Sequence, residues 1–140
     1  MSFLIFLHVF AGVLYGGQIL GLIVQLVLMC RVSREPGRTL VYDTRLVAWV
    51  CAFILISGVS VVGTGGYLVH VLHLQTVQFV LRARELMVCS FCLAVVGSLY
   101  PLLRLLVSVC EKKMIVGQSV LFLLSWMLWA STLYHMVAKV

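Results

Sequence analysis

Long apolar runs, separated by short charged segments, dominate the chain. Four runs contain no Asp, Glu, Lys or Arg, at residues 1–30, 46–81, 86–103 and 114–138. About 20 apolar residues in a helix cross about 30 Å of hydrocarbon. We therefore predict helical spans at about 3–30, 46–69, 85–107 and 115–138. The second run exceeds one crossing, and the glycine-rich cluster at residues 63–66 predicts that its helix loosens there.

Composition supports an integral membrane protein. Of the 140 residues, 64% are hydrophobic and only 10% are charged, whereas a soluble domain has about one-quarter charged residues. These values exclude a water-soluble globule, a disordered chain and a disulfide-rich secreted scaffold. Because the loop at 110–113 is very short, the sequence predicts one all-α domain over residues 1–140, an up-down-up-down transmembrane four-helix bundle. The polar loop at 31–45 is predicted to turn and continue in a short helix toward Asp43.

The distribution of Lys and Arg predicts the orientation of the bundle. One side receives seven basic residues: Arg31, Arg34, Arg38, Arg45, Arg104, Lys112 and Lys113. The other side receives three: Arg82, Arg84 and Lys139. Since basic residues concentrate on the cytoplasmic side, both termini are expected on the outer side of an inner membrane, either bacterial cytoplasmic or mitochondrial. The net charge of +6 is then a topology signal, and nucleic acid is not expected as a partner.

The five cysteines include one closely spaced pair. They lie at positions 30, 51, 89, 92 and 110. Cys89 and Cys92 have the CxxC spacing of disulfide oxidoreductases, but that chemistry needs a second cysteine pair in an outer loop. Their apolar neighbours favour buried structural thiols instead.

All four histidines are predicted at the outer side. His8 lies early in the first span, His70 and His73 follow the second, and His135 ends the fourth. Ionisable residues inside a membrane are costly and indicate function. His8, His70 and His135 are candidate axial ligands for a haem iron, with the packing alternative left open for each. His73 is better explained as part of a wet loop.

Small residues accompany these histidines at helical spacing. Gly12 and Gly16 follow His8 at i+4 and i+8, and Gly66 precedes His70 by four residues. A flat macrocycle between helices needs an imidazole beside backbone without side chains. Arg82 and Arg84 are candidate partners for haem propionates. The same glycine spacing also serves close helix packing without any ligand.

The opening residues, Phe6-Leu7-His8-Val9-Phe10-Ala11-Gly12-Val13-Leu14-Tyr15-Gly16-Gly17, resemble the first helix of the CopD-like and HemJ-like superfamily of small membrane proteins. The later Ser57-Gly58 is similar to that group's second helix. The resemblance implies a bundle of four or more helices with His8 as a metal or haem ligand. It also implies either copper handling or haem-dependent protoporphyrinogen oxidation. The chain lacks the Arg in span one and the Lys in span three of HemJ-like proteins. Copper is disfavoured because few Met or Cys residues cluster on the outer side.

The sequence therefore predicts a small membrane subunit that binds one b-type haem in the outer leaflet for respiratory or porphyrin-linked electron transfer. Such a subunit would be non-catalytic within an oxidoreductase complex. Its partners would be the lipid bilayer, other membrane subunits and a candidate quinone. The alternative is a cofactor-free accessory or assembly subunit of a membrane complex. A transporter is disfavoured because the four carboxylates, Glu35, Asp43, Glu85 and Glu111, all lie in loops or at span boundaries.

Overall fold

The computed structural model describes residues 2–32, 43–107 and 111–139 of the chain. These residues form five α-helices and one 3₁₀ turn: α1 (Ser2–Val32), α2 (Thr44–Val71), η1 (Leu74–Thr76), α3 (Gln78–Ser98), α4 (Tyr100–Leu106) and α5 (Glu111–Ala138). No strand occurs among them. The prediction of an all-α fold is thereby confirmed over the described ranges.

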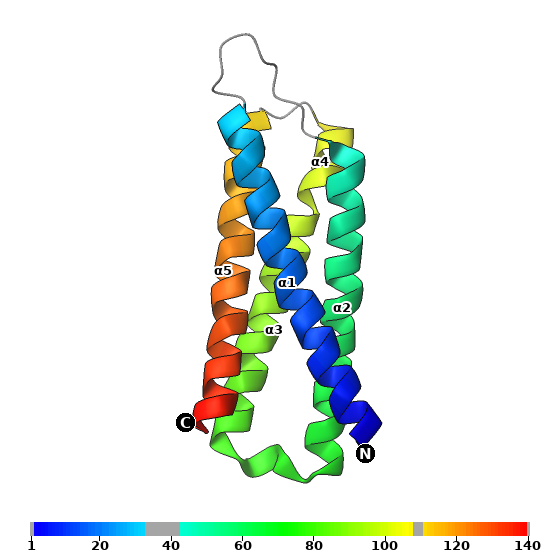
Figure 1. Cartoon of the computed structure of the whole chain (residues 1–140), viewed down its shortest axis with the longest axis vertical. Helices are drawn as coiled ribbons and strands as arrows, with labels where there is room; N and C mark the ends of the chain where they lie inside the picture. The colour runs from blue at the N-terminus through cyan, green and yellow to red at the C-terminus, as the bar shows by residue number, and fades with distance from the viewer. Residues whose placement is uncertain (1, 33–42, 108–110, 140) are drawn as a thin grey trace.

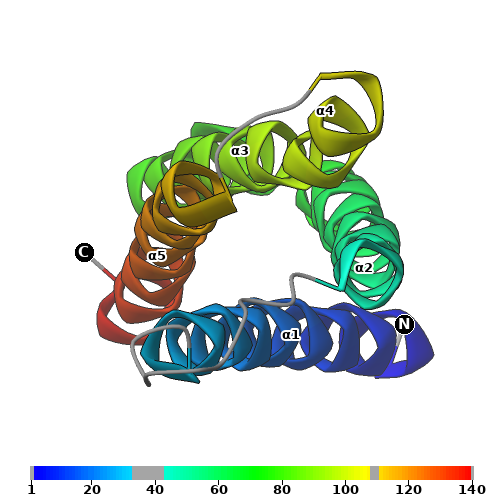
Figure 2. The ribbon, with the colours of Figure 1, turned by 90° about the horizontal axis from the view of Figure 1, so that it is seen from above.

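The long helices α1, α2, α3 and α5 surround a common centre in that order (Figure 2). α1 packs against α2 and α5, and α3 packs against the same two helices from the other side. α4 continues from α3 and lies beside α2. Both ends of the chain lie at the end of the bundle where η1 joins α2 to α3 (Figure 1).

Four helical stretches are long and apolar enough to cross a membrane: Ser2–Arg31, Thr44–Val71, Gln78–Arg104 and Lys112–Ala138. Large apolar side chains cover their outer surfaces, with Trp49 68% exposed and Phe3 73% exposed. Such a surface is unfavourable in water and favourable in hydrocarbon. The described fold is thus compatible with an integral membrane protein.

Two helices extend further than the pattern of apolar residues predicted. The expected loosening at residues 63–66 is wrong, because α2 continues to Val71. Within this stretch the Thr64 hydroxyl donates to the Ser60 carbonyl oxygen at 2.6 Å, an ordinary bond inside a helix. α3 begins at Gln78, ahead of residue 85, because its first charged side chains point outward while Val80 and Ala83 are buried. The short helix predicted before Asp43 lies outside the described residues.

Local polar contacts define the ends of α2. The Asp43 carboxylate accepts hydrogen bonds from the backbone N–H groups of Arg45 and Leu46, each at 3.1 Å. This is a standard N-cap, which pairs backbone donors that the first turn leaves free. At the other end, His73 adopts a left-handed conformation with φ of 52° and reverses the chain into η1.

Aromatic side chains fill the space beside glycines on neighbouring helices. A Cβ atom added to Gly16 of α1 would lie 2.5 Å from the Trp129 indole of α5. The same relationship joins three other pairs of helices, through Gly58 and Phe91, Gly97 and Phe122, and Gly117 and Tyr100. Each aromatic ring occupies volume that a larger residue would need. These contacts close the interior of the bundle with side chains.

Candidate functional site

His8 of α1 packs against α2 beside Thr64 and Gly65. Its Nδ1 atom lies 2.9 Å from the Thr64 Oγ1 atom. A Cβ atom added to Gly65 would lie only 2.9 Å from the imidazole Cε1 atom. The missing side chain at Gly65 therefore lets the half-buried ring reach the α2 backbone.

The Thr64 contact assigns the tautomer of the neutral His8 ring. Thr64 has one hydroxyl hydrogen, and the 2.6 Å bond to the Ser60 carbonyl oxygen uses it. Thr64 Oγ1 must then accept a hydrogen bond from His8, so Nδ1 carries the ring hydrogen. The Nε2 atom keeps its lone pair. Metal-binding histidines are commonly held in this way, with the second ring nitrogen donating to an oxygen.

His70 and His73 do not join His8. The Nδ1 atom of the exposed His70 lies 2.9 Å from the Gln75 Nε2 atom, beside η1. At 3.6 residues per turn, His70 projects about 140° away from the Gly65 direction that faces His8. His73 is exposed at the start of η1. The structure therefore does not bring the two predicted ligands of α1 and α2 together.

The other predicted residues lie near the same end of the bundle. His135 is half-buried in the last turn of α5, with its ring centroid 5.8 Å from that of Tyr134. Arg82 and Arg84 are exposed near the start of α3. These segments of α5 and α3 lie with the chain ends in Figure 1. Among the described residues, no group of three or more His, Cys, Asp or Glu could hold a metal ion.

The glycines predicted to flank a macrocycle divide into two kinds. A Cβ atom at Gly12 or Gly66 would meet no atom within 4 Å, so the space beside both is open. Gly16 is covered by the Trp129 ring instead. On α2, Gly65 contacts His8, while Gly66 faces outward. The small residues thus do not form one continuous surface for a ring inside the bundle.

The positions of His8, His70 and Trp129 show which kind of haem site the described residues fit. His8 has the tautomer of an axial ligand and has open space beside Gly12. Trp129 fills the place beside Gly16, and His70 projects away from His8. The residues therefore fit one axial bond at the edge between α1 and α2. They do not fit an interior pocket with His8 and His70 on opposite faces of one ring.

A three-residue polar cluster lies in the middle of the bundle. The Tyr15 hydroxyl of α1 lies 3.2 Å from Ser90 Oγ of α3 and 3.3 Å from Ser125 Oγ of α5. The Ser90 hydroxyl donates to the Ser125 carbonyl oxygen at 2.7 Å, and the Ser125 hydroxyl donates to the Ser90 carbonyl oxygen at 2.8 Å. All three residues are fully buried. The cluster fixes the relative positions of three helices.

Gln118 of α5 donates a hydrogen bond to a backbone carbonyl group at the junction of α3 and α4, where Pro101 lies. Pro101 has no backbone N–H, so it cannot donate to the carbonyl oxygen of Gly97 four residues earlier. The Gln118 Nε2 atom of α5 donates to that oxygen at 3.2 Å. Gln118 is fully buried, and the Gly97 carbonyl oxygen also accepts a backbone N–H at the C-terminal cap of α3. The side-chain bond adds to this backbone bond at the break between α3 and α4.

The outer face of α1 carries small and polar residues together. Gly17, Gly21 and Gln25 recur every four residues, so they lie on one helix face. A Cβ atom at either glycine would meet nothing within 4 Å. Gln25 is half-buried, and its amide makes no hydrogen bond with the described residues. Sequence reasoning focused on ionisable groups and missed Gln25, Gln118 and Thr64; uncharged polar residues inside apolar runs were the available signal.

The paired cysteines are not buried as the sequence predicted. Cys89 and Cys92 are free thiols on the exposed surface of α3. Ser90 and Ala94 occupy the interior face of that helix instead. Cys51 is buried and Cys30 is half-buried, while Cys110 lies outside the described residues.

Comparisons of the chain with models of protein families, with curated proteins and with solved structures find no match. The resemblance to the CopD-like and HemJ-like superfamily therefore stays a prediction from the residues around His8.

Proposed function

We propose that the chain is an integral membrane protein with four transmembrane helices in up-down-up-down order and both termini on the outer side. Four sufficiently long apolar helices support this proposal, as does the shared position of both chain ends. Of the basic residues predicted for the inner side, the five that the structure describes, Arg31, Arg45, Arg104, Lys112 and Lys113, lie near the opposite ends of these helices. Loops rich in Lys and Arg stay on the cytoplasmic side of a membrane, so this end of the bundle is expected on that side.

We further propose that it acts as a cofactor-free accessory subunit of a larger membrane complex, of the respiratory kind. One observation carries this proposal: the outer face of α1 presents Gly17, Gly21 and the amide of Gln25, which has no hydrogen-bond partner among the described residues. Between membrane helices, glycines permit close backbone approach, and side-chain amides hydrogen-bond across the interface. An amide that faces hydrocarbon without a partner is costly. A helix of another subunit would satisfy it.

The filled interior supports the same proposal. Trp129 and Tyr15 occupy space beside Gly16 and Gly58, where a ring-shaped cofactor would need room. The buried side-chain nitrogen and oxygen atoms of the described residues all have hydrogen-bond partners. The interior therefore has the properties of a structural core, and the surfaces that remain for function lie outside it.

Variants of the α1 face test the subunit proposal. Gly21→Leu adds bulk where a partner helix would approach, and Gln25→Leu removes the amide. Both are expected to reduce co-purification of partner subunits in mild detergent while the chain stays folded. Gly63→Leu is the matched control, because Gly63 is an open, exposed glycine on α2. Equal retention of partners by the Gly21, Gln25 and Gly63 variants would contradict the proposal.

A second candidate function is b-type haem binding through His8, with electron transfer as the role. The hydrogen bond from His8 Nδ1 to Thr64 favours it, because it leaves Nε2 as a potential iron ligand. Haem iron would supply one-electron chemistry, and a further ligand would have to come from outside the α1–α2 edge. A Soret band in the purified protein that His8→Ala removes and His73→Ala retains would favour this candidate over the cofactor-free subunit.

A further inference from the structure

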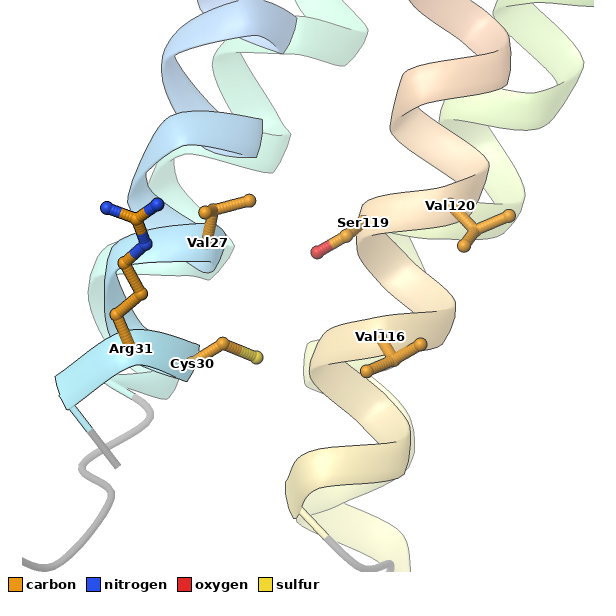
Figure 3. Close-up of a pocket in the computed structure, with 6 residues that line it drawn as sticks. All are labelled: Val27, Cys30, Arg31, Val116, Ser119 and Val120. Atoms are coloured by element: carbon orange, nitrogen blue, oxygen red, sulfur yellow. The ribbon is translucent and has the colours of Figure 1, made fainter. Parts of the chain in front are cut away.

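A groove of about 290 Å³ lies between α1 and α5, near the end of the bundle away from the chain termini. It is lined by Val27, Cys30, Arg31, Val116, Ser119 and Val120 (Figure 3). The three valines are each about half exposed, so the groove opens to the outside of the bundle. Within the apolar stretch of both helices, that outside is the lipid phase of the membrane proposed above.

The walls of the groove are apolar along most of their length. Figure 3 shows the Cys30 thiol and the Ser119 hydroxyl pointing into the gap between the helices. Ser119 donates its hydrogen to the Ile115 carbonyl oxygen at 2.6 Å, so it adds no free donor to the groove. Valine walls of this kind match a hydrocarbon chain rather than a polar solute.

Each of the two helices that form the groove carries a basic residue near this end. Arg31 of α1 lines the groove and is exposed, and Figure 3 shows its guanidinium directed back along α1 on the side away from α5. Lys112 is exposed in the first turn of α5, four residues before Val116, and therefore lies on the helix face that lines the groove. The positive end of the α5 dipole adds to the attraction for an anion there. Rotation of the long, exposed Arg31 side chain would bring its guanidinium to the groove, and an apolar groove with a basic residue on each of its helices is complementary to an acyl chain that carries a negative headgroup.

We propose that this groove binds an anionic phospholipid, with one acyl chain between α1 and α5 and its phosphate beside Arg31 and Lys112. The proposal rests on the proposed membrane insertion and orientation of the chain. Basic pockets between transmembrane helices on the inner side commonly select such headgroups. The site would be on the inner leaflet, where the basic end of the bundle lies.

Native mass spectrometry of the purified full-length chain tests the site. The protein is titrated with phosphatidylglycerol or with phosphatidylcholine of the same acyl chains, and bound lipid is counted. Two cations near the phosphate should favour phosphatidylglycerol by on the order of tenfold. Arg31→Gln and Lys112→Gln should each remove a large part of this preference. Arg84→Gln, at the opposite end of the bundle, should leave it unchanged.

A second pair of variants tests the acyl chain. Val116→Trp or Val120→Trp should fill the groove and reduce retention of the tightly bound lipid, with circular dichroism verifying that the helices remain. Excess glycerol 3-phosphate should not displace the lipid, because a free phosphate lacks the chain. Equal retention of both lipids, an unchanged preference in Arg31→Gln, or displacement by glycerol 3-phosphate would overturn the inference. Failure of the wild-type chain to float with phosphatidylcholine vesicles would overturn membrane insertion itself.

Discussion

The Nδ1 atom of His8 on α1 lies 2.9 Å from the hydroxyl oxygen of Thr64 on α2. Fifty-six residues separate the two in the chain, so the bond exists only because α1 and α2 pack together. It pairs a ring nitrogen within an apolar helix pair and leaves Nε2 as the basic nitrogen. Gly65 completes the contact by allowing the ring to approach. His8 thus has a structural role in helix packing.

Loss of the Thr64 hydroxyl is expected to destabilise this contact. Thr64→Val keeps the side-chain shape but leaves His8 Nδ1 without its oxygen partner, at a cost of about 1–3 kcal/mol. Thermal unfolding in detergent measures the effect. Ser60→Ala is the control, because the Ser60 hydroxyl donates to the Ile56 carbonyl oxygen of its own helix and, within the described ranges, bonds to no other helix. Equal destabilisation by both variants would contradict the role given to the His8 bond.

Two adjacent glycines of α1 should respond oppositely to the same substitution. Gly16→Ala places a methyl group 2.5 Å from the Trp129 ring and should destabilise the bundle by about 1–3 kcal/mol. Gly17→Ala meets open space and should leave the isolated chain unchanged or stabilise it by about 0.5–1 kcal/mol. Unfolding of both variants in the same detergent checks this difference. Similar melting curves would show that the two glycines have the same surroundings.

The Gln118 and Pro101 pair predicts a non-additive double mutant. Gln118→Leu removes the 3.2 Å bond to the Gly97 carbonyl oxygen, which keeps a backbone N–H donor, and should cost about 0.5–1.5 kcal/mol. Pro101→Ala restores a backbone N–H that is able to donate to the same oxygen. The Gln118 substitution should therefore cost less when Ala occupies position 101. Strictly additive changes in unfolding free energy would contradict this assignment.

Much of the fold follows from the sequence, because the lengths of the apolar runs determine how many helices form. The pattern did not locate the start of α3, since Arg82 and Arg84 lie on the exposed side of a helix that is already formed. It also did not separate Gly16 from Gly17, or predict that Cys89 faces outward. Those properties depend on which neighbour each helix face meets, and that information comes from contacts between distant segments.

The candidate site was predictable only in its individual residues. His8 stood out because an imidazole is costly in an apolar span. Its partner Thr64 did not, because threonine is common in such helices and satisfies its own hydroxyl locally. The expected convergence with His70 depended on the rotation of α2 about its axis. The contact between His8 and Gly65 sets that rotation and directs His70 elsewhere.

Membrane orientation gives a prediction that is independent of any ligand. A periplasmically active alkaline phosphatase fused after Val140 should be active, and a fluorescent protein that folds only in the cytoplasm should stay dark there. Fusions within the loop at 31–45 should give the reverse pattern, because basic residues retain that loop on the inner side. Fluorescence of the fusion at Val140 would contradict this orientation. It would mean that the bundle is inserted the other way, with its histidine end in the inner leaflet.

Native mass spectrometry of the protein extracted in mild detergent from its own membrane tests the central claim most directly, namely that the chain is a cofactor-free subunit held through the α1 face. The account predicts a particle that contains the 15.6 kDa chain and other polypeptides in fixed ratio, without haem. The Gly21→Leu chain should appear alone. A wild-type particle that contains only the 15.6 kDa chain, or one that carries haem bound to that chain, would contradict the account.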